Sequence, residues 1–596
     1  MRVSLKQYGN LLIRYLGPQW LEVLALAVLL LGNIGLQLIN PQIMRVFIDA
    51  AQTGGAAATL LRAALLFTAV ALVQQVVSVL VTYVGEDVAW KATNTLRADL
   101  ADHCLRLDMS FHNAHTPGEM IERIDGDVTA LSNFFSRFVV QVLGNSLLLA
   151  GVLVLLFRED WRVGLPLAAF VLLTLFILGR FRDIAVPHWA AQRQASAELF
   201  GFLEERLTGT EDIRANGAEA YVMRGFYRLM RALMQCSLKA ALMINVLLNT
   251  SFLLFTLGNM VAFAVGAWLF QAGDLTIGTV YIIFHYTNML ERPIEQISHQ
   301  LEDLQRAGAG LVRVRELLAE RSRIQQGHGT LLPGALGVEF RGVSFGYDDA
   351  LSASSNGGPG NGKEIVLRDL SFRLAPGAVL GLLGRTGSGK TTLTRLLFRL
   401  YDPDDGEICL SDGSGPISIA QLSLADLRRR VGMVTQDIQI FHAPVRDNLT
   451  FFDQTIPDER ILRVIRQLGL DEWLASLPHG LDSELDSGGG LSAGEAQLLA
   501  FARIFLQDPG LVILDEASSR LDPATEHLIE QAVDRLVQGR TAIVIAHRLR
   551  TVQRADEIMI LDDGRIGEHG ARVDLLSDAG SRFYRLLQTG LEEVLV

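Results

Sequence analysis

Residues 379–392 read Val379-Leu380-Gly381-Leu382-Leu383-Gly384-Arg385-Thr386-Gly387-Ser388-Gly389-Lys390-Thr391-Thr392. An apolar run of strand length leads into a glycine-rich segment, and a helical pattern follows it. Strand, glycine-rich loop and helix in this order are what a phosphate-binding loop requires. Glycines let backbone N–H groups converge on phosphate oxygens, and the start of the helix adds partial positive charge. The stretch therefore predicts an α/β domain that binds nucleotide phosphates.

The side chains of this loop have separate predicted tasks. Lys390 supplies a positive charge to the β- and γ-phosphates, and the Thr391 hydroxyl is available to Mg²⁺. The residues expected to contact the nucleotide are Gly384, Arg385, Thr386, Gly387, Ser388, Gly389, Lys390, Thr391 and Thr392.

Two further apolar runs end in residues with hydrolytic chemistry. Leu511 to Leu514 leads into Asp515-Glu516. An acid at the carboxyl end of a buried strand can orient Mg²⁺, and the next carboxylate, Glu516, is placed to polarise an attacking water. The run from Thr541 to Ile545 leads into Ala546-His547. His547 either contacts the γ-phosphate or is a structural histidine, and the residues themselves leave both readings open.

The first half of the chain is strongly apolar. Hydrophobic residues make up 49% of the 596 residues, and they thin out after Glu291. A membrane span needs about 20 apolar residues, and flanking residues can complete a shorter run. Six uncharged runs predict six spans, at residues 23–44, 63–84, 138–157, 163–179, 240–273 and 275–290.

The segments between these runs differ in length and charge. Residues 158–162 form a tight turn, whereas 85–137 and 180–239 are long, helix-compatible and rich in Arg. Basic residues favour the cytoplasmic side, so both long segments and both termini are expected in the cytoplasm. Breaks at 116–118 and 207–210 predict helical hairpins whose tips press on a cytoplasmic domain. A solvated hairpin without a partner is the alternative.

Composition narrows the class of protein further. Residues 1–20 are amphipathic and fit a short helix on the membrane surface better than a cleaved signal. The net charge of −12 argues against a nucleic-acid partner. The three cysteines, Cys104, Cys236 and Cys409, lie too far apart in sequence for metal-ligand spacing.

One more motif points to a family. Leu491-Ser492-Ala493-Gly494-Glu495 begins 24 residues before Asp515. With the phosphate-binding loop and Asp515-Glu516, it resembles the signature of the ATP-binding cassette (ABC) transporters. The chain is similar over nearly its whole length to fused half-transporters of the bacterial multidrug and lipid exporter type. Phe111 to Val128 and Leu203 to Phe226 resemble the two intracellular loops of that group, with coupling helices near 111–118 and 207–215.

The resemblance implies a fold and a domain order. The fold is a membrane domain of six long transmembrane helices with cytoplasmic helical extensions, followed by an α/β P-loop NTPase domain. The expected segments are a surface helix at 1–20, the membrane domain at 21–315, a linker at 316–336 and the nucleotide-binding domain at 337–596.

The resemblance also implies residue roles and cofactors. ATP and Mg²⁺ are the expected cofactors. Tyr347 stacks on adenine, Gln436 senses Mg²⁺ and contacts the membrane domain, Asp522 lies on the loop between two cassettes, and His547 is the switch histidine. Two cassettes pair head to tail, so that Ser492, Ala493, Gly494 and Glu495 contact the ATP of the partner.

Three features depart from the family pattern. The usual signature is Leu-Ser-Gly-Gly-Gln, whereas this chain has Ala493 and Glu495 at its third and fifth positions. Residues 485–490 replace a Gly-Glu-Arg-Gly stretch, so the glutamate that contacts the coupling helices has no counterpart. Residues 351–363 resemble an inserted flexible loop.

An altered signature beside Glu516 and His547 predicts an unequal pair. Heterodimeric members of the family combine one chain that keeps the catalytic carboxylate with a partner that keeps the signature. We therefore expect a second half-transporter as partner, and a homodimer that tolerates Ala493 and Glu495 is the alternative.

Substrate and direction follow from the resemblance alone. Export of a hydrophobic or amphipathic drug, lipid or peptide through the bacterial inner membrane is expected. An ABC-type importer, or an ATP-gated channel or regulator, is the alternative.

Overall fold

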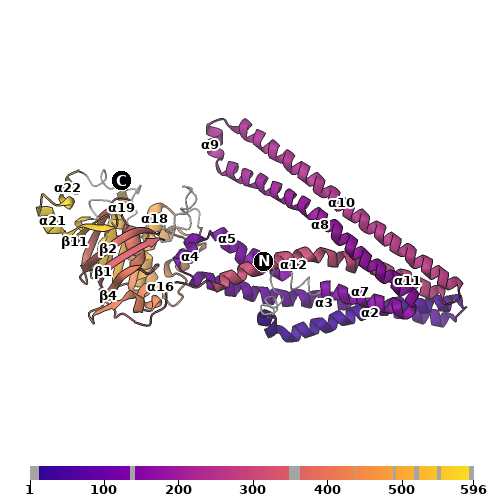
Figure 1. The fold of residues 1–596 in the computed structure, drawn as a ribbon. Helices are drawn as coiled ribbons and strands as arrows, with labels where there is room; N and C mark the ends of the chain where they lie inside the picture. Colours follow the sequence, from indigo (N-terminus) through magenta and orange to yellow (C-terminus); the bar gives the residue numbers. More distant parts are fainter. Residues whose placement is uncertain are drawn as a thin grey trace. The chain divides into compact units, whose positions relative to one another are not determined.

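The structure is a computed structural model that describes residues 13–133, 141–347, 363–435, 438–486, 491–515, 523–545 and 552–589 (Figure 1). The chain divides into two compact units. Unit 1 comprises Met1–Leu105 and Pro117–Glu320, and unit 2 comprises Arg106–Thr116 and Arg321–Val596. The tip of the first long segment therefore groups with unit 2.

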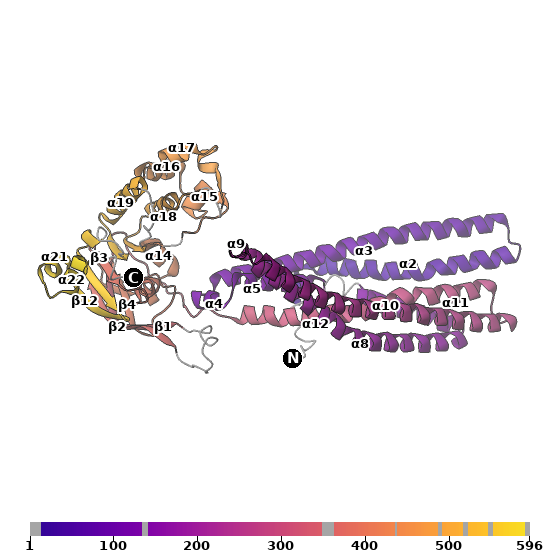
Figure 2. The same ribbon diagram turned by 90° about the horizontal axis from the view of Figure 1, so that it is seen from above.

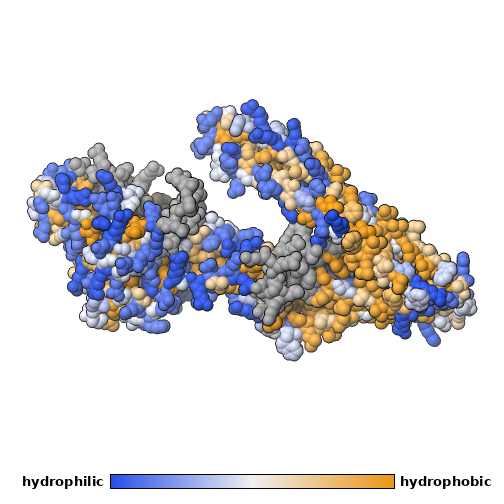
Figure 3. All heavy atoms as spheres, viewed as in Figure 1, coloured by the Kyte–Doolittle hydropathy of each residue, from blue (hydrophilic) through white to orange (hydrophobic). Residues whose placement is uncertain are grey.

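Unit 1 is entirely helical among its described residues. Five of its helices, α2, α3, α7, α8 and α10, are long and apolar enough to cross a membrane by length and composition. Figure 3 shows apolar residues gathered along the middle of this unit and hydrophilic residues around α9. The elements are η1 (Gly17–Gln19), α2 (Trp20–Gln52), α3 (Ala57–Arg106), α5 (Pro117–Ile121), the π-helix η2 (Glu122–Gly126), α6 (Asp127–Asn133), α7 (Gly144–Glu159), α8 (Trp161–Thr208), α9 (Thr210–Ala215), α10 (Glu219–Gln271), α11 (Ile277–Met289) and α12 (Glu291–Ala319).

The sixth expected span is shorter than the others. The run 275–290 falls in α11, which has 13 residues. At 1.5 Å per residue, a helix of this length covers about 20 Å, less than the ~30 Å hydrocarbon core. α12 follows directly after Leu290 and begins with the charged residue Glu291. A sixth crossing would therefore need the first turns of α12 in addition to α11.

The long segments extend their helices well past the apolar runs, as expected. α3 continues to Arg106, where the short helix α4 (Met109–Ala114) follows. Asp108 caps α4, because its carboxylate accepts hydrogen bonds from the backbone N–H groups of Ser110 and Phe111. α8 and α10 pack side by side, and α9 joins them at the break predicted for 207–210. The two predicted hairpin tips are thus α4 and α9.

A buried carboxylate ties the first long segment to α12. Asp127, at the start of α6, is 2% exposed and forms an ion pair with Arg313 of α12. Arg313 Nε donates to Asp127 Oδ2 at 2.8 Å. Val128 and Leu131 of α6 are fully buried beside this pair. Since a buried charge without a partner is costly, the pair determines how α6 lies on α12.

The first prediction concerns this ion pair. Asp127→Asn should lower the free energy of unfolding by about 1–3 kcal/mol, because a charge-assisted hydrogen bond is lost in a buried position. The measurement is the thermal unfolding of the purified full-length chain. Asp125→Asn is the control, because the Asp125 side chain is 69% exposed in its ion pair with Arg97, and exposed pairs contribute under about 1 kcal/mol. Equal losses in both variants would contradict the argument.

Unit 2 contains a mostly parallel six-stranded sheet with the order β12-β11-β3-β10-β9-β6. β3 (Val379–Gly384) lies between β10 (Thr541–Ile545) and β11 (Glu557–Asp562) and runs parallel to both. All six residues of β3 are buried, as a parallel strand covered on both faces requires. These strands lie where the sequence predicts them, and the expected fold class is confirmed.

A second, antiparallel sheet has the order β2-β1-β4-β5, and helices gather into a lobe away from it (Figure 2). The remaining elements of unit 2 are β1 (Gly337–Tyr347), β2 (Glu364–Leu374), α13 (Lys390–Leu397), β4 (Asp405–Ser411), β5 (Pro416–Ser418), η5 (Ile419–Gln421), α14 (Leu424–Arg430), β6 (Val431–Val434), β7 (Ala443–Pro444), α15 (Val445–Thr450), α16 (Asp458–Gln467), α17 (Asp471–Ser476), η6 (Gly480–Asp482), β8 (Glu484–Leu485), α18 (Ala493–Gln507), β9 (Leu511–Asp515), α19 (Pro523–Val537), β12 (Arg565–Ala571), α21 (Arg572–Ser577) and α22 (Arg582–Thr589).

Candidate functional site

The glycine-rich loop joins β3 to the start of α13. Gly384, Gly387 and Gly389 have φ angles of 149°, 83° and 100°, which residues other than glycine rarely adopt. A Cβ atom on Gly389 would also lie 2.4 Å from Leu367 Cδ2. Backbone conformation therefore requires all three glycines, and space also requires Gly384 and Gly389. Without side chains they leave the loop backbone open to an anion.

Lys390 lies folded inside this loop. Its ammonium donates to the carbonyl oxygens of Gly384 at 2.7 Å and Arg385 at 2.9 Å. Burial lowers the pKa of Lys390, and the nearby Asp515 carboxylate opposes this shift. The buried Ser388 Oγ has no hydrogen-bond partner among the described residues. A buried cation beside a free hydroxyl fits the phosphate oxygens of ATP, and Thr391 and Asp515 are the described residues suited to Mg²⁺.

The strand ends that carry the predicted chemistry meet at one edge of the sheet. Asp515, the last residue of β9, pairs in register with Ile545 of β10, and Ile545 pairs with Leu382 of β3. Asp515 is therefore brought to the phosphate-binding loop, as the sequence predicts. Glu516, His547, Gln436 and Asp522, together with residues 487–490 and 351–362, lie outside the described residues, so their predicted roles stay predictions.

Tyr347 belongs to an aromatic cluster beside the loop. Its hydroxyl lies 3.2 Å from Thr392 Oγ1, and its ring meets Tyr401 edge to face at 5.4 Å between centroids. Tyr401 accepts a 2.6 Å hydrogen bond from Asn113 Nδ2 of α4, and burial raises the Tyr401 pKa. The sequence analysis missed Tyr401 and Asn113. The position of Tyr401 just after the phosphate-binding helix could have indicated a role at the site. Its contact with Asn113 could not be predicted, because no local pattern links two residues 288 positions apart.

The signature-like segment opens α18 with a capping box. Ser492 is the N-cap, and its Oγ accepts a hydrogen bond from Glu495 N at 3.2 Å. In return Glu495 Oε2 accepts one from Ser492 N at 2.7 Å. Gly494 is buried, whereas Ala493 and Ser492 face outward. The carboxylate of Glu495 is thus fixed over the first turn of the helix.

Known proteins share this arrangement. The family model of the ABC transporter transmembrane region matches residues 23–294, and the ABC transporter family model matches residues 367–519. An ATP-dependent lipid A-core flippase of Alcanivorax borkumensis is 30% identical over 515 residues, 84% of each chain. The chain belongs to the ABC transporters. This ABC transporter is also 31% identical to a fatty acid ABC transporter ATP-binding/permease protein of Mycobacterium tuberculosis over 493 residues, 81% of this chain and 74% of that protein.

A solved structure shares its fold. A bacterial Atm1-family ABC exporter with ATP bound superposes with a TM-score of 0.75 at 24% identity, over 95% of this chain and 98% of that one. By its family this chain is an ATP-hydrolysing, multi-pass membrane transporter subunit, and its fold is that of an exporter.

The second prediction concerns Lys390. Lys390→Ala should weaken ATP binding about ten- to a hundredfold, because a charge-assisted hydrogen bond to phosphate contributes about 1.5–3 kcal/mol. Equilibrium binding of ATP to the purified full-length chain measures the effect. Arg373→Ala, an exposed arginine on β2, should leave the affinity unchanged. Equal affinity in the wild type and Lys390→Ala would show that the loop does not hold the phosphates.

Proposed function

We propose that this ABC transporter is the catalytic-glutamate half of a heterodimeric exporter. The observation that carries the proposal is the capping box, in which the Glu495 carboxylate occupies the start of α18. In the family that the chain resembles, this helix start faces the ATP held by the partner's phosphate-binding loop. A carboxylate at this position repels the negatively charged phosphate.

The charge of Glu495 matters more than its hydrogen bond. A helix start carries roughly half a positive charge, which favours an anion. Glutamine at the same position would make the same capping hydrogen bond without charge. The Glu495 carboxylate and the added methyl of Ala493 therefore weaken the hold on a γ-phosphate by about 1 kcal/mol or more. A partner bound to this signature would hydrolyse its ATP slowly.

The other composite site would use this chain's own catalytic residues. Lys390 and the loop backbone hold the phosphates, and a partner with an unaltered signature closes the site. Tyr347 stacks on adenine, Thr391, Gln436 and Asp515 hold Mg²⁺, Glu516 polarises the attacking water, His547 contacts the γ-phosphate, and Asp522 lies on the loop between the cassettes. When bound by these residues, Mg²⁺ would neutralise the charge that develops on the phosphates.

Coupling to transport is supported by α4. Asn113 of α4 bonds to Tyr401, and Tyr401 contacts Tyr347, the proposed adenine-stacking residue. Asp108, at the start of α4, also accepts a 2.6 Å hydrogen bond from Arg323 N. We infer that α4 and α9 are coupling helices on the cytoplasmic side of a bacterial inner membrane, with both termini and the nucleotide-binding domain on that side.

The proposed substrate is hydrophobic or amphipathic. Two similar proteins are named for lipid A-core and for fatty acids, both of which are amphipathic. The substrate is a lipid, drug or peptide that enters a cavity between two membrane halves and leaves on the other side. An importer, or an ATP-gated channel, remains the second candidate until transport is measured.

The third prediction separates a pump from a channel. In inside-out vesicles that contain both subunits, Glu516→Gln should bind ATP normally but lose ATP-driven uptake of a fluorescent lipid. The reason is that no carboxylate polarises the attacking water. Glu472→Gln, an exposed glutamate on α17, is the control. Equal transport by Glu516→Gln and wild type would rule out active pumping.

The fourth prediction tests the unequal pair. The purified chain alone should hydrolyse ATP slowly, and the double variant Ala493→Gly with Glu495→Gln should raise that rate about fivefold or more. A gain of about 1 kcal/mol in γ-phosphate binding corresponds to this factor. Steady-state phosphate release measures it.

Vigorous hydrolysis and a stable dimer of the wild-type chain alone would show that the partner is a second copy. A rate that stays unchanged in the double variant would show that the altered signature does not limit hydrolysis.

A further inference from the structure

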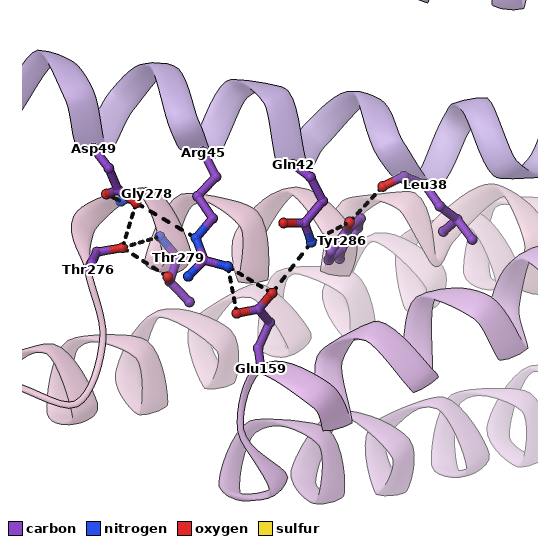
Figure 4. A network of polar contacts seen from close by, with 9 residues as sticks. All are labelled: Leu38, Gln42, Arg45, Asp49, Glu159, Thr276, Gly278, Thr279 and Tyr286. Carbon is purple, nitrogen blue, oxygen red and sulfur yellow. Dashed lines mark hydrogen bonds and ion pairs between the residues drawn. The ribbon is translucent and has the colours of Figure 1, made fainter. Parts of the chain in front are cut away.

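A polar network crosses the end of unit 1 where the α2–α3, α7–α8 and α10–α11 turns lie. Figure 4 shows Arg45 of α2 and Glu159 of α7 pointing toward one another. Arg45 Nη1 donates to the two carboxylate oxygens of Glu159 at 3.0 and 2.9 Å. Asp49 accepts hydrogen bonds from Gly278 N and Thr276 Oγ1, both at 2.9 Å. It also forms an ion pair with Arg45, with 3.7 Å between Asp49 Oδ2 and Arg45 Nε. Both carboxylates of the network are therefore already engaged.

Beside this network lies a groove between α2 and α7. Its volume is about 680 Å³, which is within the ~300–1,000 Å³ range of ligand sites. One end is lined by the polar residues Gln42, Arg45, Arg158 and Glu159. The rest is apolar, with Leu38 and Ile39 on one wall and Val154 and Leu155 on the other. We call this the α2–α7 groove.

The charge at the polar end is uneven. Two arginines and one glutamate line it, and Arg45 forms ion pairs with both Glu159 and Asp49. Glu159 is bonded to Arg45, whereas Arg158 is exposed and forms no hydrogen bond or ion pair with the part of the chain that the structure describes. The Arg158 guanidinium is thus available to an anion, and arginine suits phosphate particularly well.

The depth of the groove in the membrane matches a lipid. Arg45 and Arg158 each come directly after an uncharged run, 23–44 and 138–157 respectively, so both lie at the level of the lipid headgroups. The apolar lining residues belong to those runs and lie at the level of the acyl chains. Along the membrane normal, the groove therefore changes from polar to apolar in the same direction as an anionic lipid, from its headgroup to its acyl chains.

Two glycines determine the shape of the groove. At Gly151 the helices approach closely, because a Cβ atom there would lie 2.7 Å from Leu38 Cδ1. At Gly35 a Cβ atom would meet nothing within 4 Å. Gly35 thus leaves room on the groove wall where a side chain would fill it.

We propose that the α2–α7 groove binds a phospholipid with a net negative headgroup, its phosphate at Arg158 and an acyl chain along Gly35. This site is separate from the ATP site and rests only on the proposed membrane orientation, which makes it a site for lipids of the outer leaflet. Arg45 borders the headgroup, and its ion pair with Glu159 fixes the position of its side chain (Figure 4).

The fifth prediction tests this site on the full-length chain in detergent without nucleotide, so that its outcome does not depend on ATP hydrolysis. The probes are fluorescent phosphatidylglycerol, phosphatidylcholine and a neutral diacylglycerol with the same chains. Arg158→Gln should weaken phosphatidylglycerol binding about tenfold and leave diacylglycerol binding unchanged, as expected for a lost charge-assisted hydrogen bond. Arg158→Lys should retain most of the binding. Gly35→Leu should weaken the binding of every probe.

Matched controls lie outside the groove. Arg62→Gln removes a positive charge near the same end of α3, and Gly179→Leu adds a side chain to α8 where a Cβ atom also meets nothing within 4 Å. Both should bind like wild type. Equal weakening by Arg62→Gln and Arg158→Gln, equal binding of the three probes, or no effect of Gly35→Leu would overturn the proposal. Displacement by millimolar inorganic phosphate would also overturn it, because the site would then recognise a free anion.

Discussion

The nucleotide site depends on the parallel alignment of three buried strands. Leu382, Ile545 and Asp515 stand in register across β3, β10 and β9, so the chain leaves the sheet at one edge from each strand. Parallel strands buried on both faces cannot shift register without moving apolar side chains into contact with polar ones. For this reason the phosphate-binding loop and Asp515 meet in space. The ATPase chemistry of the family depends on the residues that meet at this edge of the sheet.

A different constraint orders the helical unit. In a bilayer core, backbone groups must bond within the chain, and charges are confined to the ends of the spans or to partners. Arg45 and Glu159 satisfy one another at the end of their helices. Outside the spans, in the first long segment, Asp127 is neutralised by Arg313 in a buried position. Arg158 has no such partner among the described residues, and its cation at headgroup depth beside an apolar groove makes the α2–α7 groove a candidate site. Polar pairing thus stabilises the bundle, and the arginine without a described partner indicates where a ligand fits.

Much of the candidate site is readable from the sequence, because its signals are local. The glycine spacing of 384–389, the strand before it and the helix after it are contiguous, as are the strand and acid of 511–515. The spacing of Ser492 and Glu495 is that of a capping box, although in the sequence Glu495 stands out only as a departure from the usual signature. The structure adds that this carboxylate is bonded to Ser492 N, which explains why the position favours Glu or Gln.

The sequence by itself determined the two-part architecture, the phosphate-binding loop, the apolar runs and the breaks at both hairpin tips. Periodicity, glycine spacing and charge distribution are properties of neighbouring residues, so no fold is needed to read them. Only the tertiary structure decided which distant side chains meet, such as Asn113 with Tyr401 and Arg45 with Glu159. It also decided that the run 275–290 forms a helix of only 13 residues, after which α12 begins at the charged residue Glu291. Such pairings depend on how helices and strands pack, and the local sequence does not predict that packing.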